Sequence, residues 1–183
     1  MEHAATCERA KNQGKLADPT NARFSGADRA MISTLVEFIL EAKRRTYAAQ
    51  GDDASVEPAL PGSQQLEYQR GEYVYRDVYF GMRRFVGQET VYHAGLPVWS
   101  MAYGGGVERP DINSDQVRSL YAFLREAMRQ VSSQRPYRGP TSHHRPPYTY
   151  SCASTGSMAA FWGEEASRTR RASCTGFVSQ EDE

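Results

Sequence analysis

Apolar residues recur at the spacing of an α-helix in two stretches of the chain. In the first, about Asp28 to Gln50, the apolar positions form one stripe, while Glu41 and Lys43 fall on the polar side. This pattern predicts an amphipathic helix that buries one side. The stripe consists of Met31, Ile32, Leu35, Phe38, Ile39, Ala42 and Thr46.

The second stretch, about Asp115 to Val131, has the same character. Asn113 or Ser114 can cap its first turn, because a short polar side chain accepts a hydrogen bond from a free backbone N–H group there. Pro136 stands beyond its end, where a proline cannot continue a helix. We therefore predict a second amphipathic helix over these residues.

The segment between the predicted helices is rich in β-branched and aromatic residues. Glycine and turn-forming residues divide it, which predicts a three-strand antiparallel meander. We interpret Gly51 to Gln65 before the strands as a turn-rich connector and Gly104 to Gly106 after them as a strand-end loop. The strands are expected at Tyr73 to Phe80, Arg84 to Tyr92 and Leu96 to Tyr103.

The strand segment has a second version later in the chain. Residues Glu72 to Glu89 and Pro147 to Glu165 share the pattern Y-x-Y-x5-G-x3/4-F-x-G-x-E, and the helices match as LVEFILEA and LYAFLREA. Internal similarity of this kind indicates a repeated supersecondary unit. The paired positions are Tyr73 with Tyr148, Tyr75 with Tyr150, Gly81 with Gly156, Phe85 with Phe161, Gly87 with Gly163 and Glu89 with Glu165.

These elements predict an α+β fold in which two repeats, each a helix plus a three-strand meander, form one antiparallel-sheet domain. We expect a disordered tail over residues 1–26 and a single duplicated domain over 27–183, with repeats at 27–107 and 113–178. The second repeat is degenerate, because ASRTRRASC replaces the apolar third strand and only Gly176 to Val178 resembles its end.

Alternation assigns the side chains of the first meander to two faces, since successive strand residues point to opposite sides. Even-numbered positions such as Val74, Val78 and Val98 are mostly aliphatic, and we expect them to lie beneath the helices. Odd-numbered positions combine aromatic rings, phenolic hydroxyls and the carboxylates of Asp77 and Glu89. A polar, aromatic face of this kind is more typical of a binding pocket than of a core.

A carboxylate among aromatic rings can neutralise an organic cation whose hydrocarbon part stacks on those rings. The sequence therefore predicts an aromatic pocket that contains a carboxylate and binds a small molecule, cationic or aromatic in character. A structural alternative stays open, because tyrosine fits a half-buried sheet and a glutamate near a turn can bind backbone N–H groups. The candidate ligand-binding residues are Tyr73, Tyr75, Asp77, Glu89, Trp99, Tyr103, Tyr150 and Glu165.

Composition and net charge limit the classes of partner that we expect this protein to bind. The 183 residues are 39% hydrophobic and 24% charged, which is typical of a globular chain. With 22 basic and 22 acidic residues, no net charge attracts nucleic acid, and we expect no direct nucleic-acid binding. No apolar run is long enough to span a membrane and the N-terminus lacks a signal-peptide core. We therefore expect a cytoplasmic location and no membrane partner, while a homodimer stays open.

No cofactor or metal site is expected from the motifs. The three cysteines form no C-x-x-C pair. His143 and His144 precede Cys152, but adjacent histidines project apart on an extended chain and no second ligand pair has suitable spacing. We interpret the histidine segment as a solvated loop.

Several segments resemble a known family. LEYQRGEYVYRDVYFG and FVGQETVYHAGLPVWSMAYGG, followed by RPYRGP, YTY and FWGEE, are similar to an uncharacterised bacterial domain of unknown function. That domain occurs alone or at the C-terminus of XRE-type helix-turn-helix regulators, so the resemblance implies an association with transcriptional regulation. It covers roughly residues 31–165 and implies no activity. The residues that carry it are Tyr73, Tyr75, Asp77, Gly81, Phe85, Gly87, Gln88, Glu89, Trp99, Tyr103, Arg138, Gly139 and Pro140.

Three functions fit these features. The leading hypothesis is a sensor-type domain that binds a small molecule on the aromatic face. The first alternative is an enzyme that uses Glu89 or Asp77 as general base, although the sequence contains neither G-x-S-x-G nor His-Glu-x-x-His and the enzyme hypothesis is the weaker one. The second alternative is a protein interaction module, which predicts a flat, exposed aromatic patch without a cavity.

Overall fold

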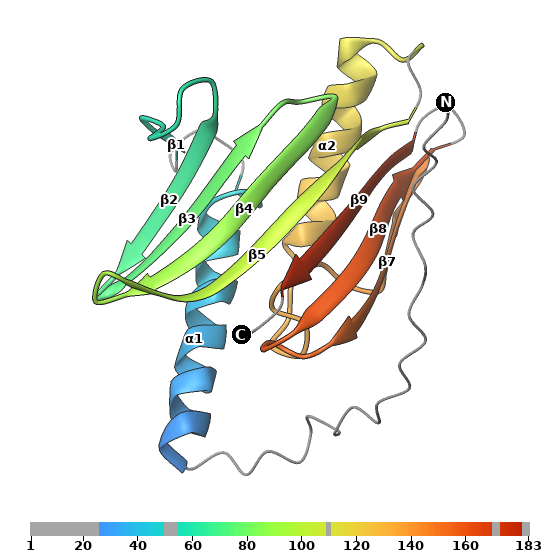
Figure 1. Cartoon of the computed structure of the whole chain (residues 1–183). Helices are drawn as coiled ribbons and strands as arrows, with labels where there is room; N and C mark the ends of the chain where they lie inside the picture. Colours follow the sequence, from blue (N-terminus) through green and yellow to red (C-terminus); the bar gives the residue numbers. More distant parts are fainter. Residues whose placement is uncertain (1–25, 50–54, 109–110, 170–172, 181–183) are drawn as a thin grey trace, which may run out of the picture.

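The computed structural model describes residues 26–49, 55–108, 111–169 and 173–180. The tail expected over residues 1–26 lies outside these ranges apart from Gly26. The described chain forms one nine-stranded antiparallel sheet and two α-helices, so the fold is α+β as the sequence predicts (Figure 1). Neither described helix is long and apolar enough to cross a membrane.

The order of strands in the sheet places the first half of the chain beside the second half. The elements in chain order are α1 (Gly26–Arg45), β1 (Ser55–Val56), β2 (Gln64–Arg70), β3 (Tyr73–Phe80), β4 (Arg84–His93), β5 (Leu96–Val107), α2 (Ser114–Met128), β6 (Ser142–Arg145), β7 (Tyr148–Gly156), β8 (Phe161–Arg168) and β9 (Ser173–Gln180). The strands lie in the order β1-β2-β3-β4-β5-β9-β8-β7-β6. The two halves therefore meet where β5 pairs with β9.

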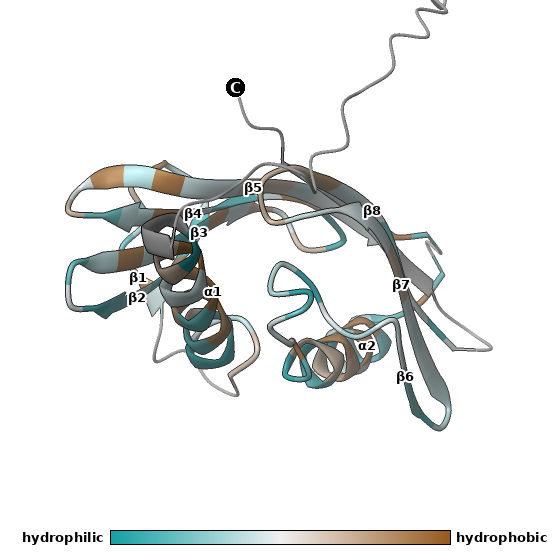
Figure 2. Cartoon of the chain, turned by 90° about the horizontal axis from the view of Figure 1, so that it is seen from below, coloured by the Kyte–Doolittle hydropathy of each residue, from teal (hydrophilic) through white to brown (hydrophobic). Residues whose placement is uncertain are grey.

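Both helices lie on the concave side of the curved sheet (Figure 2). α1 contacts β2 and β3, and α2 contacts β7 and β8. The largest buried cluster joins α1 to both halves of the sheet. It includes Phe38 of α1, Tyr75 of β3, Val91 of β4, Met101 of β5 and Phe161 of β8. The helices in the described ranges thus both cover the same face of the sheet.

α1 follows the predicted apolar pattern, although it ends at Arg45 rather than at Gln50. The difference from the prediction that matters for the site is the position of Lys43. Phe38 and Ile39 of the predicted stripe are fully buried. Lys43, which the pattern places on the polar side, is also buried. The reason is that Lys43 follows Ile39 by four positions, and residues four apart share one side of a helix.

α2 is capped as the sequence predicts. Asn113 Oδ1 accepts a hydrogen bond from the backbone N–H of Gln116 at 2.9 Å, and the backbone N–H of Asn113 donates to Gln116 Oε1 at 2.9 Å. This reciprocal pair satisfies two N–H groups that the first turn leaves free. The helix ends at Met128 rather than at Val131. Its buried residues are Val117, Leu120, Phe123, Leu124, Ala127 and Met128.

The meander predicted for the first half exists as β3, β4 and β5, which pair antiparallel in sequence order. A further strand, β2, pairs with β3 where the sequence pattern predicts no strand. Only Leu66 and Tyr68 of β2 are large apolar residues, so its alternation is weak. The backbone of β3 supplies its hydrogen-bonding partners instead, and strand propensity depends strongly on such context.

Gly104 to Gly106 lie inside β5 rather than in a strand-end loop. They pair with β4 on one side and with β9 on the other. A Cβ atom on Gly105 would lie 2.2 Å from the carbonyl oxygen of Thr175 in β9. The glycines therefore permit a close approach of the two strands that join the halves of the sheet.

The second half has a third strand after all. β9 pairs with β8 on one side and with β5 on the other. The sequence prediction was wrong because it relied on apolar side chains, whereas a central strand is also held by backbone hydrogen bonds along both edges. The segment with His143 and His144, interpreted as a loop, similarly forms β6 and pairs with β7.

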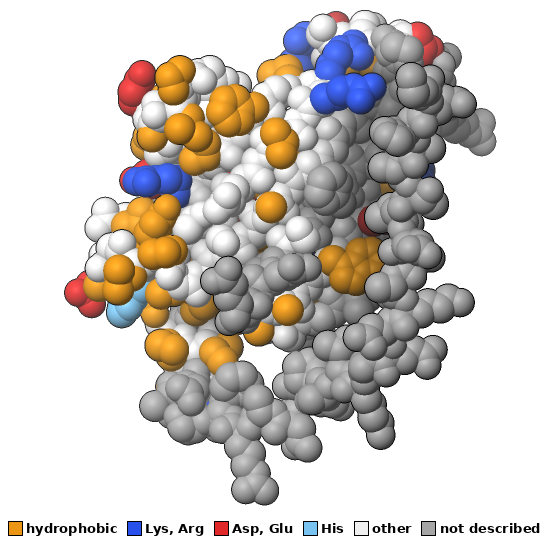
Figure 3. Space-filling model, in the orientation of Figure 1, with side chains coloured by type: hydrophobic (Ala, Val, Ile, Leu, Met, Phe, Trp, Pro, Cys, Tyr) orange, Lys and Arg blue, Asp and Glu red, His pale blue; other side chains and the backbone are white. Residues whose placement is uncertain are grey.

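The two faces of the first meander are the reverse of the expectation. Tyr75 and Met101, at odd-numbered positions, are fully buried among the residues that pack against the helices. Val86 and Val98, at even-numbered positions, are 58% and 46% exposed, and apolar side chains are visible across the outer face of the sheet (Figure 3). Large aromatic rings bury more apolar area than valine does, which favours this orientation. The carboxylates of the aromatic face are buried with it.

Candidate functional site

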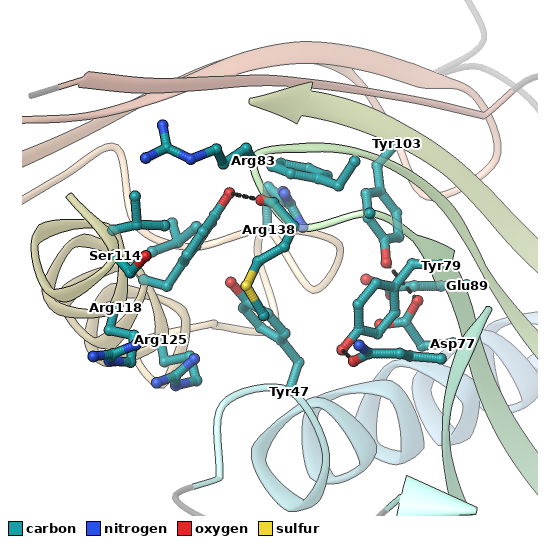
Figure 4. A pocket seen from close by; sticks show the side chains of 17 residues that line it. Tyr47, Asp77, Tyr79, Arg83, Glu89, Tyr103, Ser114, Arg118, Arg125 and Arg138 are labelled. Carbon is teal, nitrogen blue, oxygen red and sulfur yellow. Dashed lines mark hydrogen bonds between the residues drawn. The ribbon is translucent and has the colours of Figure 1, made fainter. Parts of the chain in front are cut away.

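A cavity of about 330 Å³ lies between the inner face of the sheet and the helices (Figure 4). Asp77 of β3, Glu89 of β4 and Tyr103 of β5 line it on the sheet side. Tyr121 and Arg125 of α2 also line it. Figure 4 shows Arg125 across the cavity from Asp77 and Glu89. Adjacent strands and a helix from the other half of the chain thus enclose one hollow.

Asp77 and Glu89 are neighbours across the β3–β4 pair. The register places Asp77 directly opposite Glu89. Residues that face each other on adjacent antiparallel strands point to the same side of the sheet, with their Cβ atoms roughly 5 Å apart. Asp77 is 2% exposed and Glu89 is 4% exposed. Two carboxyl groups are therefore held together out of solvent, where each needs a partner.

The partner of Glu89 is Lys43. The Lys43 ammonium donates a hydrogen bond to Glu89 Oε2 and a second one to the backbone carbonyl of Tyr137 at 3.2 Å. Burial lowers the pKa of Lys43, while the charge of Glu89 acts in the opposite direction. The last turn of α1 thus brings a cation to the carboxylate of β4.

Asp77 has a neutral partner instead. The hydroxyl of Tyr103 donates a hydrogen bond to Asp77 Oδ1 at 2.7 Å. Within the described part of the chain, no cation forms an ion pair with Asp77. Burial, and then the nearby charge of Glu89, raise the pKa of Asp77 from 3.8 to about 7, although the Tyr103 hydrogen bond acts against this. Near neutral pH, Asp77 is therefore divided between its acid and its carboxylate form.

Arg138 belongs to the same buried cluster of charges. Its guanidinium donates a hydrogen bond to Glu165 Oε1, and the hydroxyl of Tyr150 donates one to Glu165 Oε2 at 2.9 Å. The guanidinium also lies 5.8 Å from the centre of the Tyr103 ring, within cation–π range. Arg138 lines the cavity beside Tyr103, so it connects the carboxylate of β8 to the floor formed by β3, β4 and β5.

The buried charges around the cavity do not balance when all of them are ionised. The charged side chains that are buried in the described residues are Lys43, Asp77, Glu89, Arg138 and Glu165. Lys43 neutralises Glu89 and Arg138 neutralises Glu165. Asp77 is left without a cation, and an unpaired buried carboxylate is costly. The site can therefore take up one more positive charge, either a proton or a cationic group.

The structure brings together some of the predicted site residues and separates others. Of the candidate residues, Asp77, Glu89 and Tyr103 line the cavity. Tyr75 and Trp99 are core residues that do not line it. Tyr73, Tyr150 and Glu165 do not line it either. Tyr73 packs against Phe38 with ring centres 5.1 Å apart, Glu165 binds Arg138, and Tyr150 donates a hydrogen bond to Glu165.

The sequence patterns did not identify the two cationic side chains of the site or one of the aromatic residues that line the cavity. Lys43 and Arg138 lie far from β4 and β8 in the sequence, so no local pattern links them to Glu89 and Glu165. One signal was present for Arg138, since it lies in the RPYRGP segment that carries the family resemblance. Tyr47, which follows α1, also lines the cavity, although it lies beyond the apolar stripe of that helix.

Metal ligands are not gathered at this cavity or elsewhere in the described ranges. No group of three or more His, Cys, Asp or Glu side chains in those ranges is placed to hold a metal ion. His143 is engaged by Glu126, with His143 Nε2 and Glu126 Oε1 at 2.9 Å, and by the amide of Gln130 at 2.7 Å. The chemistry that the cavity offers is that of its carboxyl, phenol and guanidinium groups.

Comparison with known proteins assigns the chain to a family. Neither a curated protein nor a solved structure matches it. A family model described as "Domain of unknown function (DUF5680)" matches residues 77–176, a range that begins and ends later than the 31–165 expected from the resemblance. The match contains Asp77, Glu89 and Arg138 but not α1. Because these residues make up more than half of the 183 in the chain, the protein belongs to the DUF5680 family.

Proposed function

We propose that this DUF5680 protein binds a small organic molecule and that Asp77 receives a cationic group of that molecule. The observation that carries the proposal is the position of Asp77 at the wall of a cavity, a buried carboxyl group that no cation among the described residues pairs with. A ligand ammonium group supplies the positive charge that the buried cluster lacks. Binding then replaces the proton of Asp77, because an adjacent cation favours the ionised carboxylate.

The walls of the cavity suit the hydrocarbon part of such a ligand. Tyr79, Phe85 and Tyr121 line it with aromatic rings, and Tyr47 lines it near the end of α1. Aromatic faces attract both apolar groups and cations. The volume of about 330 Å³ lies near the lower end of the range of about 300–1,000 Å³ that is usual for small-molecule sites. This size favours a metabolite-sized molecule over a peptide.

The test is a binding screen with matched variants. Hydrophobic primary amines such as benzylamine, each with a neutral isostere such as benzyl alcohol, are titrated into the protein by calorimetry and thermal shift. We expect the amines to bind the wild type more tightly above pH 7 than at pH 5, since protons compete for Asp77. Asp77→Asn should lose this preference, while Glu164→Gln, a change of an exposed carboxylate on β8, should keep it.

Two results would end the proposal. One is the absence of a thermal shift or heat of binding with every amine of the panel. The other is equal affinity of the amines for wild type and Asp77→Asn, because an ammonium group bound next to Asp77 must bind more weakly when the carboxylate is removed.

A second function is favoured by the position of Asp77, which is hydrogen-bonded to Tyr103 at the cavity and whose pKa burial raises to about 7. A carboxyl group with that pKa, beside the phenol of Tyr103 in a cavity, suits general acid–base catalysis. Molecules found in the binding screen are incubated with the protein in deuterated water and followed by NMR. Deuterium exchange or bond cleavage in the wild type, lost in Asp77→Asn, would support catalysis. Unchanged spectra would leave binding as the function of the site.

The interaction-module hypothesis is the weakest of the three. It requires a flat, exposed aromatic patch, whereas Tyr75, Trp99 and Tyr103 are buried. A sensor role in transcriptional regulation remains part of the binding proposal, and it rests on the resemblance to domains of XRE-type regulators.

We also infer that the two halves arose by duplication. Tyr75 and Tyr150, at paired positions, are both fully buried, and Glu89 and Glu165 are each bound by a buried cation. Gly81 and Gly156 share a positive φ, 82° and 106°, at the turn of equivalent hairpins. Under this proposal Asp77 corresponds to Cys152, so the free carboxyl group is the feature that distinguishes the first half.

A further inference from the structure

α2 presents arginine side chains to the cavity. Arg118 and Arg125 both line it and are seven positions apart, which places them on one side of the helix. Figure 4 shows their guanidinium groups on the α2 side, with Asp77 and Glu89 across the cavity. The cavity thus has a carboxylate end and a guanidinium end.

Most of the arginines at the cavity already have partners. Arg138 binds Glu165, and Arg83 donates a hydrogen bond to the carbonyl of Ile112. Arg118 lines the cavity and pairs with Asp115 of the first turn of α2, and both side chains of this pair are largely exposed. For Arg125, the described residues provide no side-chain hydrogen bond or ion pair. It is half-buried, so it faces the hollow with its charge unmatched.

We infer that the ligand is amphoteric, which means here that it carries both an ammonium group and a carboxylate. The ammonium group binds Asp77 and the carboxylate binds Arg125. An apolar spacer between Tyr79 and Tyr121 joins the two groups. The inference rests on the proposed function, because it adds a second contact to the same cavity. A guanidinium presents parallel N–H donors that match the two oxygens of a carboxylate. A molecule with both groups satisfies the unpaired acid and the unpaired base of the cavity at once, and its net charge of about zero matches theirs.

The test compares molecules that share a ring and differ in their charged groups. Benzylamine, benzoate and 4-(aminomethyl)benzoate are titrated by calorimetry into wild type, Arg125→Gln and Arg84→Gln. Arg84 is an exposed arginine at the start of β4 and serves as the matched control. A series of ω-amino acids of increasing chain length then locates the spacing that bridges the two ends of the cavity.

We expect the wild type to bind the best amphoteric compound about tenfold or more tightly than the corresponding amine, which is the gain from one charge-assisted contact. Arg125→Gln should abolish this gain. Benzylamine should bind the variant at least as tightly as the wild type, because the change removes a positive charge from the cavity that receives the ammonium group. Arg84→Gln should retain the gain.

The inference is overturned if amines bind through Asp77 but no amphoteric compound binds more tightly, or if Arg125→Gln retains the gain. The proposed function survives both results. If neither amines nor amphoteric compounds bind, the proposed function fails and this inference fails with it. Tighter binding of benzoate than of 4-(aminomethyl)benzoate would also overturn it, because the site would then select an anion alone.

Discussion

Removing Lys43 should destabilise the protein strongly, because Glu89 would lose its cation. The two side chains are only 9% and 6% exposed, so water cannot replace the lost partner. Breaking a buried ion pair from one side typically costs about 3–5 kcal/mol. For a chain of this size, each kcal/mol lowers the thermal midpoint by roughly 2–4 °C. Lys43→Met should therefore lower the midpoint by about 6–20 °C.

The double variant Lys43→Met/Glu89→Leu separates the loss of the pair from the loss of one partner. With no charge left unpaired, it should recover most of the stability, since replacing both members of a buried pair by apolar residues is often neutral. Urea denaturation of wild type, both single variants and the double variant gives the coupling free energy.

Asp115→Asn serves as the control. It removes the exposed Arg118–Asp115 pair, whose side chains are 70% and 80% exposed, and it should change little. A cost below about 1 kcal/mol for Lys43→Met, or a double variant as unstable as the two losses added together, would refute this account of the buried pair.

Three further predictions concern the floor of the cavity. Folding raises the pKa of Asp77 from 3.8 to about 7. The free energy of unfolding of the wild type should therefore fall, relative to that of Asp77→Asn, as the pH rises from about 4 to about 7, and then level off. Urea midpoints of the two proteins that stay parallel across this pH range would contradict the prediction. Tyr103→Phe removes the hydrogen bond that lowers the pKa of Asp77. An NMR titration of the Asp77 carboxyl carbon should therefore give a higher midpoint in this variant than in the wild type. An unchanged or lower midpoint would show that the Tyr103 hydrogen bond does not lower this pKa. Gly87→Ala places a Cβ atom 2.5 Å from the Tyr103 ring and 2.7 Å from Tyr79 Cβ. It should cost about 1–3 kcal/mol in urea denaturation and weaken amine binding, and a variant as stable as the wild type would show that the two tyrosines can move aside.

The sequence predicted the parts of the fold that depend on local patterns. Both helices, the Asn113 cap and the strands β3 to β5 follow from periodicity and capping rules applied to short segments. It failed for β2 and β9, whose side chains alternate weakly and whose stability comes from backbone pairing with strands far away in the sequence. It also chose the wrong inner face, because valines and tyrosines both suit a buried sheet and only the packing of α1 decides between them.

The candidate site was predicted to a similar extent. Asp77, Glu89 and Tyr103 share one face by simple alternation, and the structure places all three at the cavity. Tyr75 and Trp99 share that face too, but they lie where α1 and the other half of the sheet cover it. Lys43 and Arg138 could not be assigned, since their partners are 46 and 27 positions away along the chain.

The position of β9 means that the sheet can be completed only after the end of the described chain has been synthesised. β9 is the last described strand along the chain, yet it lies inside the sheet between β5 and β8. Until it is synthesised, β5 has an unpaired edge, and such an edge can pair with other chains. The walls of the cavity come from both halves of the chain, and β9 pairs with one strand of each half. A nascent chain that stalls before Ser173 would thus lack the strand that joins β5, at the wall with Asp77 and Glu89, to the second half of the sheet.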